Sequence, residues 1–470
     1  MRGQSQYRVG TLVYTRAALV QVMFWMLLGD FVLTLMESSV PAILPLQLRW
    51  ADGSDFEIAL LALSIPAVLT MILAPIVGVQ SDQCRSPMGR RRPFFLWFSP
   101  CVVASLLLLG FAQPLSVRLA EMLPGVKEAA MLKGLLALGA VCYTASNVYI
   151  LSNYQFLIKD IIPEQVLGKF IGFFRAVGGL GGFAFNRFVF SHVHDHTAEV
   201  YMVCALVYAA GFALLFLLVR EGEYPPIKRM SGGGARLDRI REYCRRCFGH
   251  GFYLKIYAQS FCYWSGWVPF TTFIVFFATM ADKPGYAATL GLSVEDFGKI
   301  KAWTLLVQIP VFFIAGWLGD RFHPLRVQMV SSLVVGFVYL TGFFTARTPD
   351  TFLLWWICSA ASCAAFLASY LTSLARLFPA AHFGECVSAN TIIFHLGLIF
   401  SPMLAAQVLQ WTHDYRVVFL WTGAFSTVGG IITIFLYRDW LRLGGDAAYK
   451  PPGEEPDRKP EEDCVSTAKP

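Results

Sequence analysis

Long apolar runs, separated by short polar segments, recur along almost the whole chain. A helix needs roughly 20 apolar residues to cross a bilayer core, and helices that face lipid are apolar all round rather than along one stripe. Twelve runs meet this requirement. They lie at roughly 17–46, 57–79, 93–112, 134–157, 168–190, 199–219, 253–278, 298–319, 325–345, 351–374, 385–410 and 416–437. The pattern therefore predicts an all-α membrane protein with twelve transmembrane helices.

The charged residues change this picture by giving it an orientation. If both termini are cytoplasmic, the inner segments hold about 26 of the 38 Lys and Arg residues, which is the bias that membrane proteins show. Arg2, Arg8 and Arg16 precede a full-length span without a small-residue cleavage site, so no cleavable signal peptide is expected. We expect a multi-pass protein of the cell (plasma or inner) membrane, and the net charge of +7 then indicates topology rather than a nucleic-acid partner.

The longest inner segment, residues 220–252, is basic and glycine-rich and divides the spans into six and six. It is expected to be a cytoplasmic loop between an N-terminal half, residues 1–219, and a C-terminal half, residues 253–437. Residues 438–470 are rich in Pro, Glu and Lys, which predicts a disordered cytoplasmic tail.

Two short motifs recur at matching places in the two halves. One pairs Gly78-x-x-x-Asp82 with Gly316-x-x-x-Asp320-Arg321, after the second and eighth spans; the other pairs Ser54-Asp55-Phe56 with Glu295-Asp296-Phe297, before the same spans. Repeated halves of this kind place a substrate site between them, near the bilayer midplane. The repeat predicts a carrier that opens this site to each side of the membrane in turn.

The loop after the second span contains the clearest candidates for gating residues. Gly78 can let two helices approach closely, Asp82 can accept hydrogen bonds from a helix N-terminus, and the run Gly89-Arg90-Arg91-Arg92 can hold carboxylates and free carbonyl groups. Together with the copy at Gly316, Asp320 and Arg321, these residues are predicted to close the cytoplasmic side. The alternative is that the arginines only anchor the loop by positive charge.

Across its helical length the chain resembles the major facilitator superfamily, and one segment resembles a loop of the proton-coupled sucrose and glycoside transporters. That segment is Ser81-Asp82-x-Cys84-x-Ser86-x-x-Gly89-Arg90-Arg91-Arg92-Pro93-Phe94. The resemblance implies two six-helix halves of major facilitator type and symport of a sugar with a cation. The chain departs from that branch at Gln83, where an Arg is usual, and at Thr144 and Gln155, where an Asp and an Arg are usual. It lacks the branch's proton-binding acid, which puts sucrose itself in doubt.

Two carboxyl groups in the first span are candidates to replace that acid. Asp30 and Glu37 are seven residues apart and therefore share a helix face, and an ionisable group at membrane depth is costly and usually functional. At about 1.5 Å per residue, Asp30 lies roughly 20 Å into the span, near mid-bilayer. Arg175 in the fifth span is the natural counter-ion. We predict that these three residues couple transport to a proton, the alternative being a fixed structural ion pair.

The resemblance implies that the first, fourth, seventh and tenth spans line the substrate cavity. Hydroxyl and amide groups beside aromatic rings on these spans suit a sugar, although aromatic residues at helical spacing also occur in ordinary helix packing. A histidine of the eleventh span can join them. The predicted substrate-binding residues are Thr144, Asn147, Tyr154, Gln259, Tyr263, Trp267, Tyr370 and His395.

Enzyme motifs are absent from the sequence. It has no phosphate-binding Gly-x-x-x-x-Gly-Lys loop, no His-Glu-x-x-His pair and no soluble domain that could hydrolyse ATP. We therefore expect no enzymatic activity, no cofactor and no bound metal, and a monomer that moves a small-molecule substrate with a proton or sodium ion. The alternatives are a drug or metabolite exporter, a lysolipid or siderophore carrier, or a non-transporting sensor on the same scaffold.

Overall fold

The computed structural model describes residues 7–123, 125–222, 236–280, 287, 289–379 and 382–452. This part of the chain is almost entirely helical, with one short hairpin of strands β1 (Tyr7–Val9) and β2 (Leu12–Tyr14) before the first long helix. Twelve helical segments are long and apolar enough to cross a membrane. The prediction of a twelve-helix membrane protein is confirmed.

The N-terminal half contributes six of these segments. In chain order they are α1 (Arg16–Trp50), the continuous run α2 (Asp55–Ala59), η1 (Leu60–Ser64) and α3 (Ile65–Gln83), then α4 (Arg92–Gly110), α6 (Glu128–Ile161), α7 (Glu164–Ala184) with η2 (Phe185–Val189) and η3 (Phe190–His192), and α8 (Thr197–Leu218). A short helix, α5 (Ala112–Met122), follows α4 outside this set.

The C-terminal half contributes the other six. They are α10 (Gly251–Thr279), α11 (Val294–Phe322), α12 (Pro324–Thr345), α13 (Pro349–Leu377), α14 (Phe383–Thr412) and α15 (Val417–Arg442). The helix α9 (Arg236–Phe248) precedes α10, so part of the predicted central loop is helical. Residues 438–442 continue α15, and Gly445–Ala448 form α16, so the predicted disordered tail was wrong for this stretch. The predictions for residues 223–235 and 453–470 lie outside the described residues.

The motif that recurs before the second and eighth spans marks a helix start in both halves. The Ser54 hydroxyl oxygen accepts a hydrogen bond from the Glu57 backbone N–H, and Ser293 does the same for Asp296. Such caps satisfy backbone donors that lack partners in the first turn. The repeated acidic residues also lie where the helix dipole favours negative charge.

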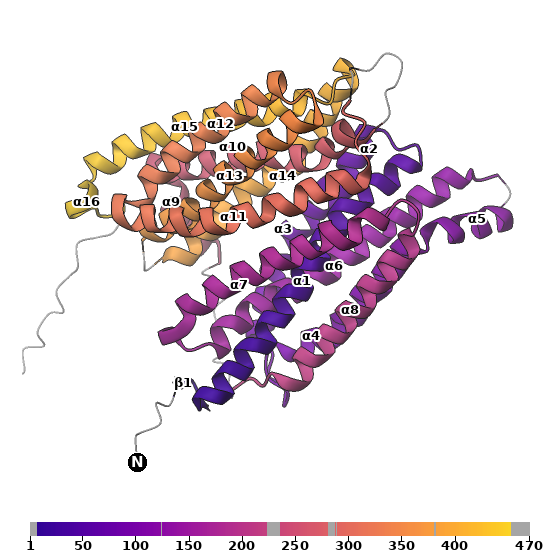
Figure 1. Ribbon diagram of the computed structural model, residues 1–470. Helices are drawn as coiled ribbons and strands as arrows, with labels where there is room; N and C mark the ends of the chain where they lie inside the picture. Colours follow the sequence, from indigo (N-terminus) through magenta and orange to yellow (C-terminus); the bar gives the residue numbers. More distant parts are fainter. Residues whose placement is uncertain are drawn as a thin grey trace, which may run out of the picture.

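The two halves form separate helical bundles that lie side by side (Figure 1). Between them, α7 packs against α11, and α14 packs against α2, η1 and α3. The bundles meet at the end of the molecule where α2 lies, whereas the start of α1, next to β1, lies at the opposite end (Figure 1). The junction between the halves is therefore bordered by α7, α11, α14 and the run from α2 to α3, with a smaller contact of α1 on α10.

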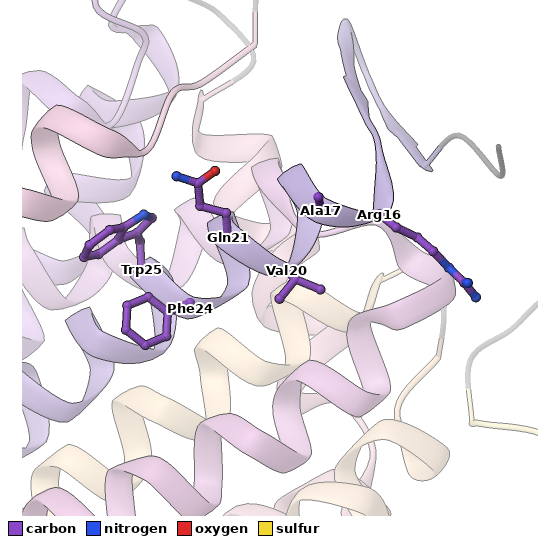
Figure 2. Close-up of a pocket in the computed structure, with 6 residues that line it drawn as sticks. All are labelled: Arg16, Ala17, Val20, Gln21, Phe24 and Trp25. Carbon is purple, nitrogen blue, oxygen red and sulfur yellow. The ribbon is translucent and has the colours of Figure 1, made fainter.

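The first turns of α1 line an open groove of about 600 Å³. Figure 2 shows its lining residues, Arg16, Ala17, Val20, Gln21, Phe24 and Trp25, all from this one helix. The Phe24 and Trp25 rings meet edge to face with centroids 5.1 Å apart. This groove contains none of the predicted site residues, so we place the candidate site further along α1, around Asp30.

Candidate functional site

Asp30 lies in the middle of α1 and is only 3% exposed. Its Oδ2 atom is buried without a hydrogen-bond partner among the described residues. A side-chain Cβ at Gly178 of α7 would lie 3.2 Å from that oxygen and 3.2 Å from the Thr34 hydroxyl. The bare backbone of Gly178 therefore makes room for a carboxyl group that the fold leaves unpaired, and leaving a buried polar group unpaired has a free-energy cost.

Arg175 and Glu37 flank this carboxyl group. Both act electrostatically on Asp30, and Arg175 lies almost one helical turn before Gly178 on α7. The Arg175 side chain is exposed and forms no ion pair within 4.0 Å in the described part of the chain. The structure thus brings the three predicted coupling residues into one neighbourhood without joining them in an ion pair.

The three predicted substrate contacts on α6 differ in their accessibility. Tyr154 is fully buried and donates a hydrogen bond to the Met26 carbonyl oxygen, one turn before Asp30. Thr144 and Asn147 are half-buried, and the Asn147 Oδ1 atom has no partner among the described residues. In this conformation Tyr154 supports α1, while Asn147 retains a free acceptor.

In the C-terminal half, the Tyr370 hydroxyl group joins three helices. It lies 3.0 Å from the Ser260 hydroxyl of α10 and accepts a hydrogen bond of 2.8 Å from the Asn390 side-chain amide of α14. The Asn390 Oδ1 atom is buried without a described partner. This cluster, Ser260, Tyr370 and Asn390, therefore has an unused acceptor.

Aromatic rings lie beside this cluster on α10. Trp264 stacks on Phe394 with ring centroids 5.5 Å apart and meets Trp267 edge to face at 5.7 Å. Tyr263 stacks on Phe366 at 4.0 Å. Trp264 and Trp267 are half-buried, and Trp264 follows Ser260 of the polar cluster by about one helical turn.

Two further predicted contacts are occupied within the protein. The Gln259 side-chain oxygen accepts a hydrogen bond of 3.0 Å from Gln328 of α12, so Gln259 holds α10 against α12. His395 Nδ1 lies 2.8 Å from the Thr391 carbonyl oxygen on its own helix. Neither side chain is directed at the polar cluster by a described hydrogen bond.

The predicted gating loop is organised by Glu221, which follows α8. Its carboxylate accepts hydrogen bonds from the backbone N–H groups of Arg90, Arg91 and Arg92, at distances from 2.7 to 3.1 Å. These groups form the start of α4, where unpaired donors and the helix dipole favour an anion. Burial raises the pKa of the nearby Cys84 thiol, and the negative charge of Glu221 adds to this effect.

The arginine side chains bind two aspartates of the same half. Arg90 and Arg91 both contact Asp160 at the end of α6, at 2.6 and 3.1 Å, and Arg91 also contacts Asp82 at 2.7 Å. Arg91 is buried and donates to the Ser81 hydroxyl as well. Arg92 donates to the Phe216 carbonyl oxygen of α8. The loop therefore ties α3, α4, α6 and α8 together.

The repeated motif of the C-terminal half, around Asp320 and Arg321, also forms ion pairs, but fewer of them. Asp320 pairs with Arg376 of α13 at 3.3 Å, and Arg326 pairs with Asp446 at 2.6 Å. Arg321 lies over the Trp317 ring at 5.5 Å. A Cβ at Gly78 would lie 3.9 Å from its nearest neighbour and one at Gly316 would have none within 4 Å, so neither glycine is needed for close helix packing here.

Sequence reasoning missed Asp160 and Glu221. The repeat contains a signal for Asp160, because Asp160 precedes Pro163 by three residues, as Arg376 precedes Pro379. The N-terminal half thus has an acidic residue where the C-terminal half has a basic one. Asp160 pairs with Arg90 and Arg91, and Arg376 pairs with Asp320. Glu221 has no comparable signal, since it is one acidic residue at the end of an apolar span.

Replacing Gly89 with alanine is expected to cost about 1–3 kcal/mol of stability. Gly89 has a φ of +112°, and an added Cβ would lie 2.7 to 2.9 Å from Glu221 atoms. Thermal unfolding in detergent measures the effect. Gly134→Ala is the control, because Gly134 is helical and its Cβ would meet nothing within 4 Å. Equal stability of the two variants would contradict this account of the loop.

Three hydrogen bonds join the two halves in the described part of the chain. Arg49 and Asp55 of the N-terminal half both bond to the Tyr415 hydroxyl group at 3.1 Å, and Ser64 donates to the Ile399 carbonyl oxygen at 2.7 Å. Arg49 also pairs with Asp55. Arg49, Asp55 and Tyr415 lie at the end of the molecule where α1 finishes and α2 begins, so the halves are tied together there.

The sequence is similar to a known protein family and to a curated transporter. A family model described as the Major Facilitator Superfamily matches residues 261–463. A general alpha-glucoside permease from Schizosaccharomyces pombe is 26% identical over 220 residues, which cover 43% of this chain and 38% of that protein. The match thus spans well under half the length of this relative.

Solved structures match over nearly the whole chain. The nucleoside transporter NupG has a TM-score of 0.67 at 12% identity, covering 88% of this chain and 100% of its own. A D-xylose-proton symporter has a TM-score of 0.64 at 14% identity, with 88% and 97% covered. A bacterial homolog of the human lysosomal transporter Spinster, inward-facing and unoccupied, has 0.59 at 16%, with 91% and 97% covered. At these identities the likeness concerns the fold alone.

Proposed function

The chain belongs to the major facilitator superfamily of transporters, and we propose that it moves a small sugar or glycoside by alternating access, driven by a proton gradient. The observation that carries this proposal is the buried carboxyl group of Asp30 beside Gly178, whose Oδ2 atom has no partner among the described residues. A carboxyl group without a fixed cation can be neutral or charged, so it can bind a proton on one side of the membrane and release it on the other.

The contacts between the halves support alternating access. The described hydrogen bonds across the interface lie at the α2 end and at Ser64, whereas the arginine pairs at the opposite end stay within one half. With cytoplasmic termini, as the charge distribution predicts, these contacts hold the halves together on the outer side. In this conformation the loop pairs would then stiffen each half, and the closure of the cytoplasmic side expected from the sequence would form only in another conformation.

A sugar is favoured as substrate by the C-terminal polar cluster and by the permease relative. The Asn390 side-chain oxygen has no partner among the described residues, and Trp264 and Trp267 are half-buried aromatic residues of α10. Sugars need hydrogen-bond partners for their hydroxyl groups and an apolar face for their C–H groups, and sites of this kind combine a few placed polar groups with aromatic walls. A drug or lipid carrier would call for a more uniformly apolar lining.

Uptake into proteoliposomes tests the proposal. The purified protein, proposed to act as a monomer in the cell membrane, would be reconstituted and given an inward proton gradient with a panel of radiolabelled mono- and disaccharides and α-glucosides. At least one saccharide should accumulate above its external concentration, and a protonophore should abolish the accumulation. Failure of every saccharide, with uptake of an apolar drug or a lysolipid instead, would contradict the proposal.

A further inference from the structure

Two polar side chains on α11, Lys301 and Gln308, take no part in the site described above. Both are half-buried on a helix that otherwise qualifies as a membrane span. Neither side chain has a hydrogen bond or ion pair with the described residues. An ionisable group at membrane depth without a protein partner is a candidate functional group.

The neighbours of α11 show which way Lys301 and Gln308 are directed. Leu305 and Ile309 contact glycines of α7, while Thr304 accepts a hydrogen bond of 3.0 Å from Trp356 of α13. At about 100° per residue, Lys301 and Gln308 lie between the α7 face and the α13 face. The exposed residues Trp303, Ile314 and Trp317 lie on the other side of the helix. Lys301 and Gln308 are therefore directed towards the space between the halves.

Contacts through α7 show that Gln308 lies at the same depth in the membrane as Asp30 of α1. A Cβ at Gly179 would lie 3.6 Å from Ile309, and the adjacent Gly178 faces Asp30. This puts Asp30 level with Gln308.

One turn further on, a Cβ at Gly182 would lie 3.2 Å from Leu305 and 3.6 Å from Ser38. Glu37 precedes Ser38, and Lys301 lies one turn beyond Leu305. Because α1 and α11 run in opposite directions, Glu37 comes level with Leu305, and Lys301 lies about one helical turn further towards the α2 end.

We propose that Lys301 and Gln308 are further substrate contacts of the C-terminal half and donate hydrogen bonds to hydroxyl oxygens of a saccharide that also reaches Glu37 and Asp30. A hydroxyl group both donates and accepts hydrogen bonds. One polyol can therefore donate to the carboxylates of α1 and accept from the Lys301 ammonium group and the Gln308 amide group. The inference rests on the proposed function, because it assigns the substrate of that same site.

Deoxy analogues of the transported saccharide test the assignment. In the wild type, removing the hydroxyl group that Lys301 contacts should raise KM about tenfold, as expected for a hydrogen bond to a charged group. In Lys301→Met the parent saccharide should bind about tenfold more weakly, and that one deoxy analogue should lose no further affinity. Gln308→Leu should do the same for a different hydroxyl group.

Lys299→Met is the matched control, because the Lys299 ammonium already pairs with Glu295 and Asp296. It should leave the wild-type pattern of KM values unchanged. A purely structural role for Lys301 would weaken all analogues by the same factor, and that result would overturn the inference.

A second measurement does not depend on the identity of the solute. A water-soluble acylating reagent should modify Lys301 in the intact wild-type protein, as shown by mass spectrometry, with Lys299 as the accessible reference. If Lys301 is labelled but the protein transports no saccharide, the proposed function is refuted. The result would still show that Lys301 lies in a water-filled site. If Lys299 reacts and Lys301 does not, the inference fails. With a transported saccharide, saturation should slow the labelling of Lys301 and not that of Lys299, and equal slowing would also overturn it.

Discussion

Replacing Asp30 with asparagine is expected to abolish accumulation of solute against its gradient while leaving solute exchange across the membrane intact. The amide has nearly the same size, so it fits beside Gly178 without a new contact. It cannot bind and release a proton, however, and proton binding is the step that would couple the gradient to transport. Because Asp30 forms no described ion pair, the substitution strands no buried cation, and the fold should tolerate it.

Proteoliposomes separate the two activities. Accumulation is followed under an imposed pH gradient, and exchange is followed as counterflow of labelled solute with equal internal and external pH. Asp195→Asn is the matched control, because Asp195 lies in a short loop and its side chain is 77% exposed. Retained accumulation in Asp30→Asn, at the wild-type rate, would mean that Asp30 has a structural role only.

Glu37→Gln distinguishes the two carboxyl groups of α1. Asp30 is more deeply buried than Glu37, which is half-buried. If Asp30 carries the proton and Glu37 binds the solute, Glu37→Gln should raise KM and leave proton-driven accumulation in place. The same uptake assay measures both effects.

The double substitution Arg91→Ala with Arg92→Ala is expected to lower turnover about tenfold or more while changing solute affinity about twofold or less. Arg91 is one of the two guanidinium partners of Asp160, whose side chain is only 12% exposed. Removing one partner of a buried charge is strongly unfavourable. Arg92 supplies the contact to α8, so the variant loosens the end of the N-terminal half that must move as one body. The solute site, near mid-membrane, is not part of this network.

Initial rates of uptake and equilibrium binding measure turnover and affinity separately. Arg85→Ala, in the same loop, removes a positive charge without touching Asp160, so it serves as the control for charge alone. Thermal unfolding shows whether the double variant is folded at the assay temperature. A folded double variant with wild-type turnover, or one in which affinity falls as much as turnover, would refute a role of the arginines in movement.

Local sequence patterns were sufficient for the helices and for the repeat. A membrane span must be apolar along its whole length and satisfy its backbone hydrogen bonds internally, so the run that predicts α1 needs no information from distant residues. The repeated acidic motif is likewise local, because Ser54 and Ser293 cap helices whose first turns follow within three residues. The candidate carboxyl groups were visible for the same reason, since any charge inside an apolar run is conspicuous.

Pairing between distant residues was not visible in this way. Nothing near Glu221 in the chain indicates that it caps α4, 130 residues away, and nothing near Gln308 indicates that it comes level with Asp30. Hydrogen bonds and ion pairs depend on distances of a few ångströms between atoms, and such distances between segments exist only after the helices have packed. The sequence by itself therefore determined the twelve spans, the two halves and the presence of charge at membrane depth. The tertiary structure alone decided which charges meet, at which end the halves touch, and that Asp30 Oδ2 has no partner among the described residues.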